Sequence, residues 1–392
     1  MMKQHIKQIV SVTCCLTLAF GAFATDWYVD QTNGDNGKDG KSPATAKKAL
    51  STVWKEFAKA GDTVWIMGEM KISSTIDINQ NPGIVIAGYG DNATISLKEG
   101  YALTLLKISV DSVVSNLTLK GGICDKSAGS DEESYPAAGA EVSNGKLTHC
   151  RITGCRPKDA NNHCSAVRIT GTGVVESCDI YDNDAGTLKY SYAAGVDLNE
   201  TTAKLLNSRI YNCRGRACAV FVEKGLVEGC EIFNNTNYPA SQLTYTSPAA
   251  GSGAGLRADG SGSRVSRCRI YGNYGYGNGG GFWLRDGAIV ENCLICENHA
   301  ATSGGAIYSN SGNSTIRFCN IGGNVADSGD GAAIYVNGGS PVFKNNIIYG
   351  NGADPDRQIK LESASASASC SPASRRSSWP PSRPSSRVSR PA

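Results

Sequence analysis

Apolar and polar positions recur along this chain in one order, apolar-x-x-Cys-x-Ile-x-x-Asn. The pattern is complete over residues 175–183. Further clear copies centre on Cys230, Cys268, Cys293 and Cys319, and weaker ones on Leu117, Cys150, Ser208 and Asn346. The centres follow one another at a mean step of about 29 residues, a spacing that indicates a solenoid of stacked repeats.

A second pattern, small-small-apolar-x-apolar, alternates with the first. Its copies begin at Gly139, Ala166, Gly195, Ala219, Gly255, Gly281, Ala306 and Ala333. Each repeat lacks a helical period, is too short for a four-stranded propeller blade, and contains short alternating runs broken by Asn, Gly and Ser. The combination predicts an all-β fold, a parallel β-helix whose repeats occupy residues 111–361.

Stacked coils place equivalent side chains about 4.8 Å apart, so each repeated position forms a file along the axis. The repeated cysteines are expected to point inward as small apolar fillers beside a file of isoleucines. The repeated asparagines are expected to form a ladder at a turn, with each amide bonded to the coils above and below. The predicted ladder comprises Asn183, Asn235, Asn273, Asn298, Asn324 and Asn351.

One helix is predicted, over residues 46–60. Ala46, Ala49, Leu50, Val53, Trp54 and Phe57 follow helical spacing, with Thr45 as N-cap and Gly61 after the end. An open stack of strands exposes an unpaired edge, so this capping α-helix is expected to cover the first coil. Residues 25–110 then form the N-terminal cap and the first coils.

Both ends of the chain differ from the repeats. Residues 1–24 have the basic start, apolar stretch and small-x-small ending of a signal peptide, which predicts export to the cell surface, the outer membrane or the medium. Residues 362–392 are a low-complexity Ser/Arg/Pro segment, interpreted as a disordered tail or as the product of a truncation or frameshift.

The net charge of +3 is produced by these two ends. Without them the chain is slightly acidic, which argues against a nucleic-acid partner. No transmembrane span is expected in the mature chain, because no internal apolar run is long enough. A monomer is expected.

Several segments resemble a known group of proteins. Residues 27–30, 42–45 and 61–64, which read WYVD, SPAT and GDTV, look like the N-terminal cap of bacterial secreted right-handed parallel β-helix proteins of the pectate-lyase-like superfamily. The GGAI motif at 304–307 is similar to the repeats of polymorphic outer membrane proteins. The resemblance implies a right-handed coil, and it leaves activity open because the superfamily includes lyases, hydrolases and non-catalytic surface proteins.

The x position of the small-small-apolar-x-apolar strand is expected to face outward. In chain order this row holds Glu141, Arg168, Asp197, Phe221, Arg257, Trp283, Tyr308 and Tyr335. The last four, Arg257, Trp283, Tyr308 and Tyr335, are the predicted ligand-binding residues, because an exposed aromatic row suits sugar faces or a partner protein. The alternative is a self-stacking ladder that only stiffens the sheet. Tyrosine-rich insertions before these strands are expected to project from one edge.

Three functions remain open at this point. The leading hypothesis is an adhesin-like, non-catalytic protein that binds a polysaccharide or a partner protein surface and needs no cofactor. A Ca²⁺-dependent polysaccharide (uronate) lyase would require Asp182, Asp184 and Asp197 to converge, with Arg168, Lys189 or Arg216 as the base. The third is a structural spacer.

Of the cysteines outside the inward file, four form two close pairs in the sequence. Cys155 and Cys164, and likewise Cys213 and Cys218, bracket an insertion each, and two local disulfides are predicted for an exported chain. The Cys293-x-x-Cys296 spacing is interpreted as core packing, because no second such pair or nearby histidine completes a metal site.

Overall fold

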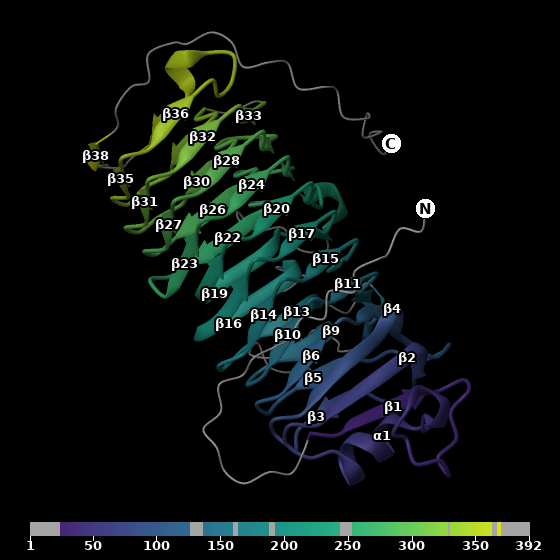
Figure 1. Ribbon diagram of the computed structural model, residues 1–392. Coiled ribbons are helices and arrows are strands. Elements are labelled where there is room, and N and C mark those ends of the chain that lie inside the picture. The colour runs from purple at the N-terminus through teal and green to yellow at the C-terminus, as the bar shows by residue number, and fades with distance from the viewer. Residues whose placement is uncertain are drawn as a thin grey trace, which may run out of the picture.

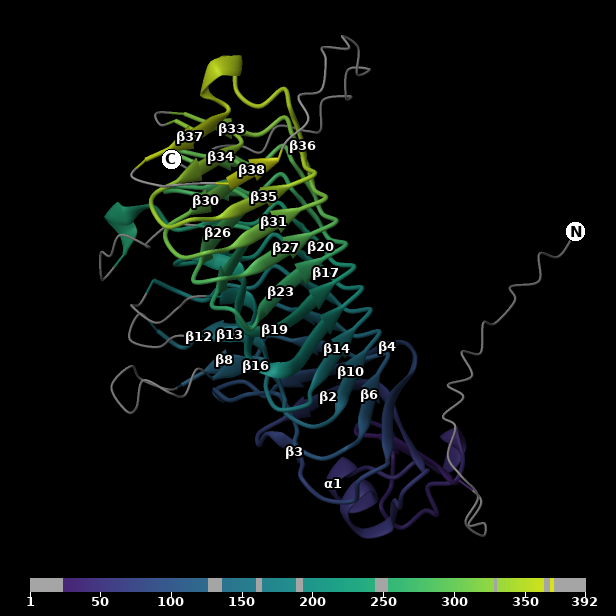
Figure 2. The same ribbon diagram turned by 90° about the vertical axis from the view of Figure 1, so that its left-hand side faces the viewer.

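The computed structural model describes residues 24–125, 136–159, 164–187, 193–243, 253–327, 330–362 and 367–369. Most of the predicted leader and of the predicted tail lies outside these ranges. Within them the chain winds into a parallel β-helix, in which every coil contributes strands to three faces that run along one axis (Figures 1 and 2). No helix in the described ranges is long and apolar enough to cross a membrane.

The first face contains the strands that carry the small-small-apolar-x-apolar pattern. Its members are β3 (Ile76–Ile78), β5 (Leu106–Ile108), β9 (Ala137–Val142), β13 (Ser165–Ile169), the start of β16 (Ala193–Leu206), the start of β19 (Cys218–Glu228), β22 (Leu256–Asp259), β26 (Phe282–Arg285), β30 (Ile307–Ser309), β34 (Ile334–Val336) and β37 (Ile359–Leu361).

The second face follows the first in each coil. It comprises β1 (Asp26–Asp30), β2 (Thr63–Ile72), β4 (Val85–Leu97), β6 (Val113–Ser115), β10 (Lys146–Thr148), β14 (Val174–Glu176), the ends of β16 and β19, β23 (Ser263–Ser266), β27 (Ile289–Glu291), β31 (Thr315–Arg317), β35 (Val342–Lys344) and β38 (Ser367–Ser369).

The third face begins after the cysteine position, and the ends of β2 and β4 extend onto it. Its strands are β7 (Thr118–Lys120), β11 (Arg151–Thr153), β15 (Asp179–Tyr181), β17 (Arg209–Tyr211), β20 (Glu231–Phe233), β24 (Arg269–Tyr271), β28 (Leu294–Cys296), β32 (Asn320–Gly322) and β36 (Ile347–Tyr349).

Two small parallel sheets lie beyond the asparagine turn. One pairs β8 (Ile123–Cys124) with β12 (Arg156–Pro157), and the other contains β18 (Arg214–Gly215), β21 (Thr236–Asn237), β25 (Tyr274–Gly275), β29 (His299–Ala300) and β33 (Val325–Ala326). Three short 3-10 helices complete the described chain: η1 (Pro43–Thr45), η3 (Ala240–Gln242) and η4 (Pro355–Arg357).

The predicted capping helix is present but shorter than expected. It consists of α1 (Leu50–Thr52) and one π-helical turn, η2 (Val53–Phe57), with Ala49 rather than Thr45 as N-cap. Residues 46–48 are extended instead, because Lys47 forms two backbone hydrogen bonds with β1. Its N–H donates to the Tyr28 carbonyl, and its carbonyl accepts from the Asp30 N–H. The amide oxygen of Asn36 accepts from the N–H groups of Lys48 and Ala49 and so ends this extended stretch.

The inward files are confirmed. Cys150, Cys178, Cys230, Cys268, Cys293 and Cys319 are all buried, and the isoleucine two positions after the repeated cysteine is fully buried in β11, β15, β17, β20, β24, β28 and β32. Each of these six thiols donates to a backbone carbonyl two residues earlier. One hydrophobic cluster therefore runs from β1 to β35 without interruption.

The asparagine ladder is also confirmed. In each of its central members the side-chain N–H group donates to an isoleucine carbonyl of the preceding coil and to the amide oxygen of the next asparagine. Asn298 shows the full set: its oxygen accepts from the backbone and side chain of Asn273, and its amide donates to Ile270 and Asn324 at 2.9 and 3.0 Å. The ladder ends at Gln358, whose side-chain oxygen accepts from Asn351.

The two predicted disulfides are wrong. Cys155 and Cys213 occupy the ladder position of their own coils, where their backbone N–H groups donate to Asn183 and Asn235. None of the four cysteines forms a disulfide and all four are buried, and burial raises the pKa of the Cys155 and Cys213 thiols to about 12.

We expect a single described thiol to react in the native protein. Cys296 points outward from β28 and is the one half-exposed thiol among the twelve described cysteines. Reaction with a thiol reagent, followed by peptide mass spectrometry, should label Cys296 first and the buried cysteines only after denaturation. Rapid native labelling of Cys293 or Cys319 would contradict the inward file.

Candidate functional site

The predicted aromatic row exists in the expected register. Backbone pairing aligns Arg257 with Trp283, Trp283 with Tyr308, and Tyr308 with Tyr335. The guanidinium of Arg257 lies 4.1 Å from the centre of the Trp283 ring, and the rings of Tyr308 and Tyr335 stack at 5.3 Å. The sequence pattern therefore identifies neighbours correctly.

The exposure predicted for this row is wrong for three of its four members. Arg257, Trp283 and Tyr308 are 6%, 3% and 7% exposed, and only Tyr335 is half-buried. Glycine turns before β22 and β26 pack against the row and contribute to its burial. A Cβ added at Gly253 would lie 2.7 Å from the Trp283 Cβ, and both Gly253 and Gly279 adopt positive φ, near +71° and +72°.

A stacked aromatic ladder does reach the surface, on the third face. Tyr181, Tyr211, Phe233 and Tyr271 are half-buried, and successive ring centres lie 5.0, 4.9 and 4.9 Å apart in nearly parallel planes. Because each inner ring covers the faces of its neighbours, mainly ring edges remain for solvent. This ladder fits a stiffening role better than stacking on a sugar.

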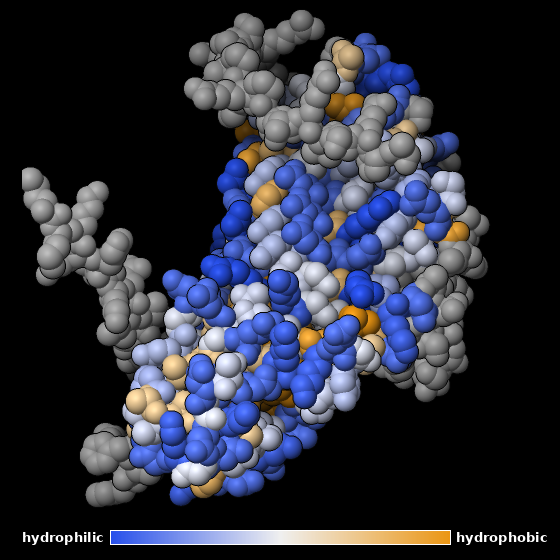
Figure 3. Space-filling view, turned by 90° about the vertical axis from the view of Figure 1, so that its right-hand side faces the viewer, coloured by the Kyte–Doolittle hydropathy of each residue, from blue (hydrophilic) through white to orange (hydrophobic). Residues whose placement is uncertain are grey.

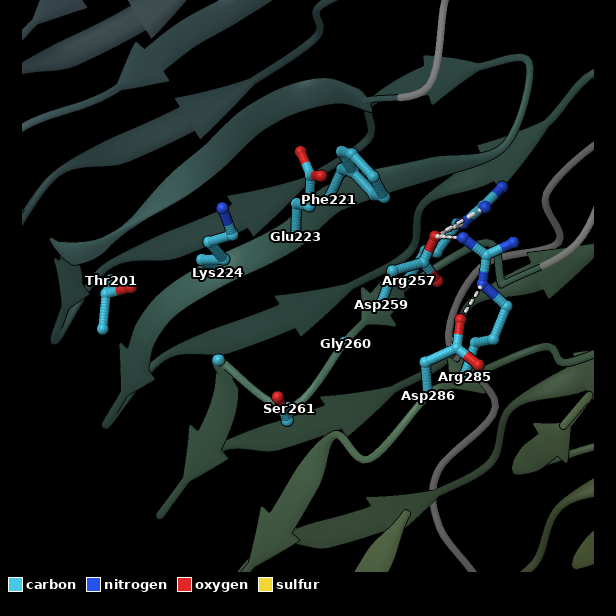
Figure 4. Close-up of a pocket in the computed structure, with 11 residues that line it drawn as sticks. Thr201, Phe221, Glu223, Lys224, Arg257, Asp259, Gly260, Ser261, Arg285 and Asp286 are labelled. Atoms are coloured by element: carbon cyan, nitrogen blue, oxygen red, sulfur yellow. Dashed lines mark hydrogen bonds and ion pairs between the residues drawn. The ribbon is translucent and has the colours of Figure 1, made fainter. Parts of the chain in front are cut away.

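An open pocket of about 540 Å³ lies where the first face turns into the second (Figure 4). It sits beside the row, at the ends of β22 and β26 and the matching bends of β16 and β19. Its lining combines both charges with hydroxyl and backbone groups: Thr201, Phe221, Glu223, Lys224, Arg257, Asp259, Gly260, Ser261, Gly262, Arg285 and Asp286. We call this pocket the groove.

One wall of the groove is an ionic network whose centre, Arg257 and Asp259, is buried. Asp259, 5% exposed, accepts from Arg257 at 2.6 Å and pairs with Arg285 at 3.2 Å. Arg285 also pairs with Asp286 at 2.8 Å, as Figure 4 shows. The second oxygen of Asp259 has no hydrogen-bond partner in the described chain, although it is buried. A buried carboxylate normally satisfies its oxygens, so this one is an exception among the described residues.

Asp197 lies on β16, one coil before Phe221, and the two residues are in register. Phe221 lines the groove. Its side chain is buried and one oxygen lacks a partner within the described residues. Burial raises the pKa of Asp197 from 3.8 to about 7; Arg168 opposes this increase and Glu223 adds to it. The first face thus has a carboxyl group that titrates near neutral pH.

Comparison with known proteins identifies the family. The family model described as "Right handed beta helix region" matches residues 72–250 and 243–371, well over half of the chain. The chain belongs to this right-handed β-helix family. No curated protein matches it.

The right-handed β-helix also resembles solved structures at low identity. A pectate lyase, Pel9A, is 15% identical, with a TM-score of 0.32 over 89% of this chain and 79% of that one. The catalytic domain of Agl-KA is 14% identical, with a TM-score of 0.41 over 89% and 69%. The A-module of the mannuronan C-5 epimerase AlgE4 from Azotobacter vinelandii is 14% identical, with a TM-score of 0.40 over 87% and 100%.

The carboxylates proposed for a calcium-dependent lyase do not converge on this β-helix. Asp182 is exposed at the asparagine turn, Asp184 accepts from the Tyr238 hydroxyl and the Gly186 N–H, and Asp197 lies on the first face. No group of three or more potential metal ligands is found among the residues that the structure describes. The predicted calcium set is therefore wrong.

The candidate bases for that lyase are also dispersed. Arg216 is 2% exposed, and Arg168 pairs in register with Asp197 on the first face. Lys189 lies outside the described residues. Several tyrosines of the predicted projecting insertions also lie outside the described residues. Tyr274 and Tyr276 are described, and their rings pack edge-to-face with centres 4.9 Å apart.

Sequence reasoning missed most of the groove. It followed one outward position per strand, whereas Glu223, Asp259 and Arg285 stand two residues further along β19, β22 and β26. Because side chains in a strand alternate between faces, these residues belong to the same outer face as the aromatic row. Extending the pattern by two positions would have found Asp259 and Arg285, which pair in regular register.

Proposed function

We propose that this chain is an exported carbohydrate-binding protein, adhesin-like in role, that holds a polysaccharide in the groove. The observation that carries the proposal is the buried Arg257–Asp259 ion pair, joined by the partly exposed Arg285, in the wall of an open pocket of about 540 Å³. Burying charges is costly unless they are fixed by partners, so a buried network beside an open pocket is typical of a binding site.

The lining suits hydroxyl-rich ligands. Glu223, Asp259 and Asp286 accept hydrogen bonds, whereas Lys224 and Arg285 donate them, and sugar hydroxyls do both. Because the two charges are mixed, a neutral glycan fits better than a highly charged one. The aromatic row contributes indirectly: Trp283 lies against Arg257 and so fixes the guanidinium that holds Asp259.

Binding can be tested by affinity electrophoresis and calorimetry of the full chain with a panel of neutral and acidic polysaccharides. We expect Glu223→Ala and Asp286→Ala each to weaken binding of the selected polysaccharide about tenfold, because each removes charge-assisted contacts worth about 1.5 kcal/mol. Asp91→Ala removes an exposed carboxylate from β4, outside the groove, and is the matched control.

The alternatives give different results in the same assay. Equal binding by all three variants would place any glycan site elsewhere on the molecule. Absence of binding across the panel would favour a structural spacer. Progressive fragmentation of a bound polysaccharide would identify an enzyme rather than an adhesin.

A further inference from the structure

A second pocket, of about 400 Å³, lies in the N-terminal cap and is lined by residues of the capping helix and of the strands β2 and β3. It is separate from the groove and shares no lining residue with it. Its lining includes four lysines, Lys48, Lys55, Lys71 and Lys98, and a single carboxylate, Asp77. We call it the lysine pocket.

The four lysines of the lysine pocket have no acid paired with them in the described chain. Some lysines elsewhere pair with acids, as in Lys107–Glu141 at 2.8 Å and Lys158–Asp125 at 2.8 Å, whereas others, such as Lys120 and Lys344, form no ion pair among the described residues. None of the four lysines of the lysine pocket forms an ion pair within the described ranges. Four lysines and one carboxylate line the pocket, so its lining carries a net positive charge that favours an anionic ligand.

The walls of the lysine pocket are tied together by hydrogen bonds. The side chain of Gln31 accepts from the backbone N–H of Lys71 at 2.8 Å and donates to its carbonyl at 2.9 Å. On the helix side, the amide of Asn81 donates to the carbonyl of Trp54 at 2.8 Å. The backbone of Lys71 and the end of the helix are therefore fixed before a ligand arrives, which lowers the entropic cost of binding.

Hydroxyl groups accompany the lysines. Ser51, Ser73, Ser74 and Thr75 line the same pocket. Ammonium groups recognise carboxylates and sulfates, and hydroxyls bond to sugar oxygens. A membrane surface is less suitable, because the pocket is concave and its lining is mainly charged and polar. Figure 3, which shows the side opposite to that of Figure 2, has hydrophobic residues scattered among hydrophilic ones.

We propose that the lysine pocket binds the anionic groups of an acidic polysaccharide. The four lysines neutralise its carboxylate or sulfate groups, and the serines and Thr75 hydrogen-bond to adjacent sugar oxygens. This site is independent of the groove, so either one can bind its ligand without the other. An exported protein with both sites engages two kinds of extracellular polysaccharide.

The test is binding of polygalacturonate to the full chain, measured by calorimetry at 25 and 200 mM NaCl. We expect Lys71→Gln/Lys98→Gln to weaken binding about tenfold at the lower salt concentration, and the higher salt to weaken wild-type binding. The control is Lys120→Gln/Lys344→Gln, which removes the same charge from two exposed lysines on other faces. Its binding should equal that of the wild type.

Several results would overturn the proposal: no binding at 25 mM NaCl, equal loss in the test and control variants, or unchanged binding in the test variant. Parallel sedimentation with phosphatidylglycerol vesicles separates the ligand classes, because vesicle binding without polygalacturonate binding would assign the pocket to a membrane. Glu223→Ala in the groove should leave polygalacturonate binding unchanged. The result for the lysine pocket therefore does not depend on whether the groove binds a polysaccharide.

Discussion

Replacing Asn298 with alanine should lower the free energy of unfolding by about 4 kcal/mol. The side chain accepts from the backbone N–H and the side chain of Asn273 and donates to Ile270 and Asn324, and it is fully buried. Alanine removes all four bonds and leaves the Asn273 N–H without a partner in a site that water does not reach. Urea unfolding, followed by circular dichroism, measures the loss.

The matched control is Asn320→Ala. Asn320 is exposed on β32, so its removal should cost less than about 1 kcal/mol. Asn298→Asp adds a second test, because aspartate retains the acceptor but loses the donor to Ile270 and Asn324. If Asn298→Ala were as mild as Asn320→Ala, the ladder would be a by-product of the turn rather than a source of stability.

The ladder also shows which features of the fold can be predicted from the sequence. Its six asparagines were identified from spacing alone, because a file needs only that each coil repeats the same position. Cys155 and Cys213 were assigned to disulfides instead, although they stand five residues after Cys150 and Ser208, as each asparagine does after its own centre. A thiol can fill this position because the backbone N–H still donates to the asparagine of the following coil.

Exposure was harder to predict than register. Trp283 was placed correctly beside Arg257, but whether its ring meets solvent depends on the path of the turn at Gly253 in the preceding coil. Glycine is compatible with many paths, so its presence in the sequence did not reveal that the turn folds inward. The aromatic row was therefore assigned to ligand binding when it supports the floor of the first face.

The groove was missed for a related reason. Between β16 and β19 the register shifts twice after Leu198, so Glu223 and Lys224 cannot be aligned with β16 by counting residues. Irregular pairing of this kind is where side chains are redirected, often beside functional sites. The repeat predicts the regular part of each coil, and the groove lies where the repeat is interrupted.

Replacing Asp197 with asparagine should stabilise the protein at pH 8 and have little effect at pH 4. Burial raises the pKa of Asp197 to about 7, from 3.8 in an exposed carboxyl. The folded state therefore holds the proton more tightly than the unfolded state, and stability falls as pH rises from about 4 to about 7. Ionising Asp197 in the folded protein costs roughly 4 kcal/mol, which asparagine avoids.

The informative quantity is the difference in unfolding free energy between Asp197→Asn and the wild type at each pH, because the other titrating groups largely cancel. That difference should grow from near zero at pH 4 to a few kcal/mol at pH 8. The value at pH 8 is reduced by the favourable Arg168–Asp197 interaction that the substitution removes. The control, Asp286→Asn at the exposed rim of the groove, should change stability by less than about 1 kcal/mol at both pH values. A difference independent of pH would mean that Asp197 is ionised throughout, and that Arg168 compensates for its burial.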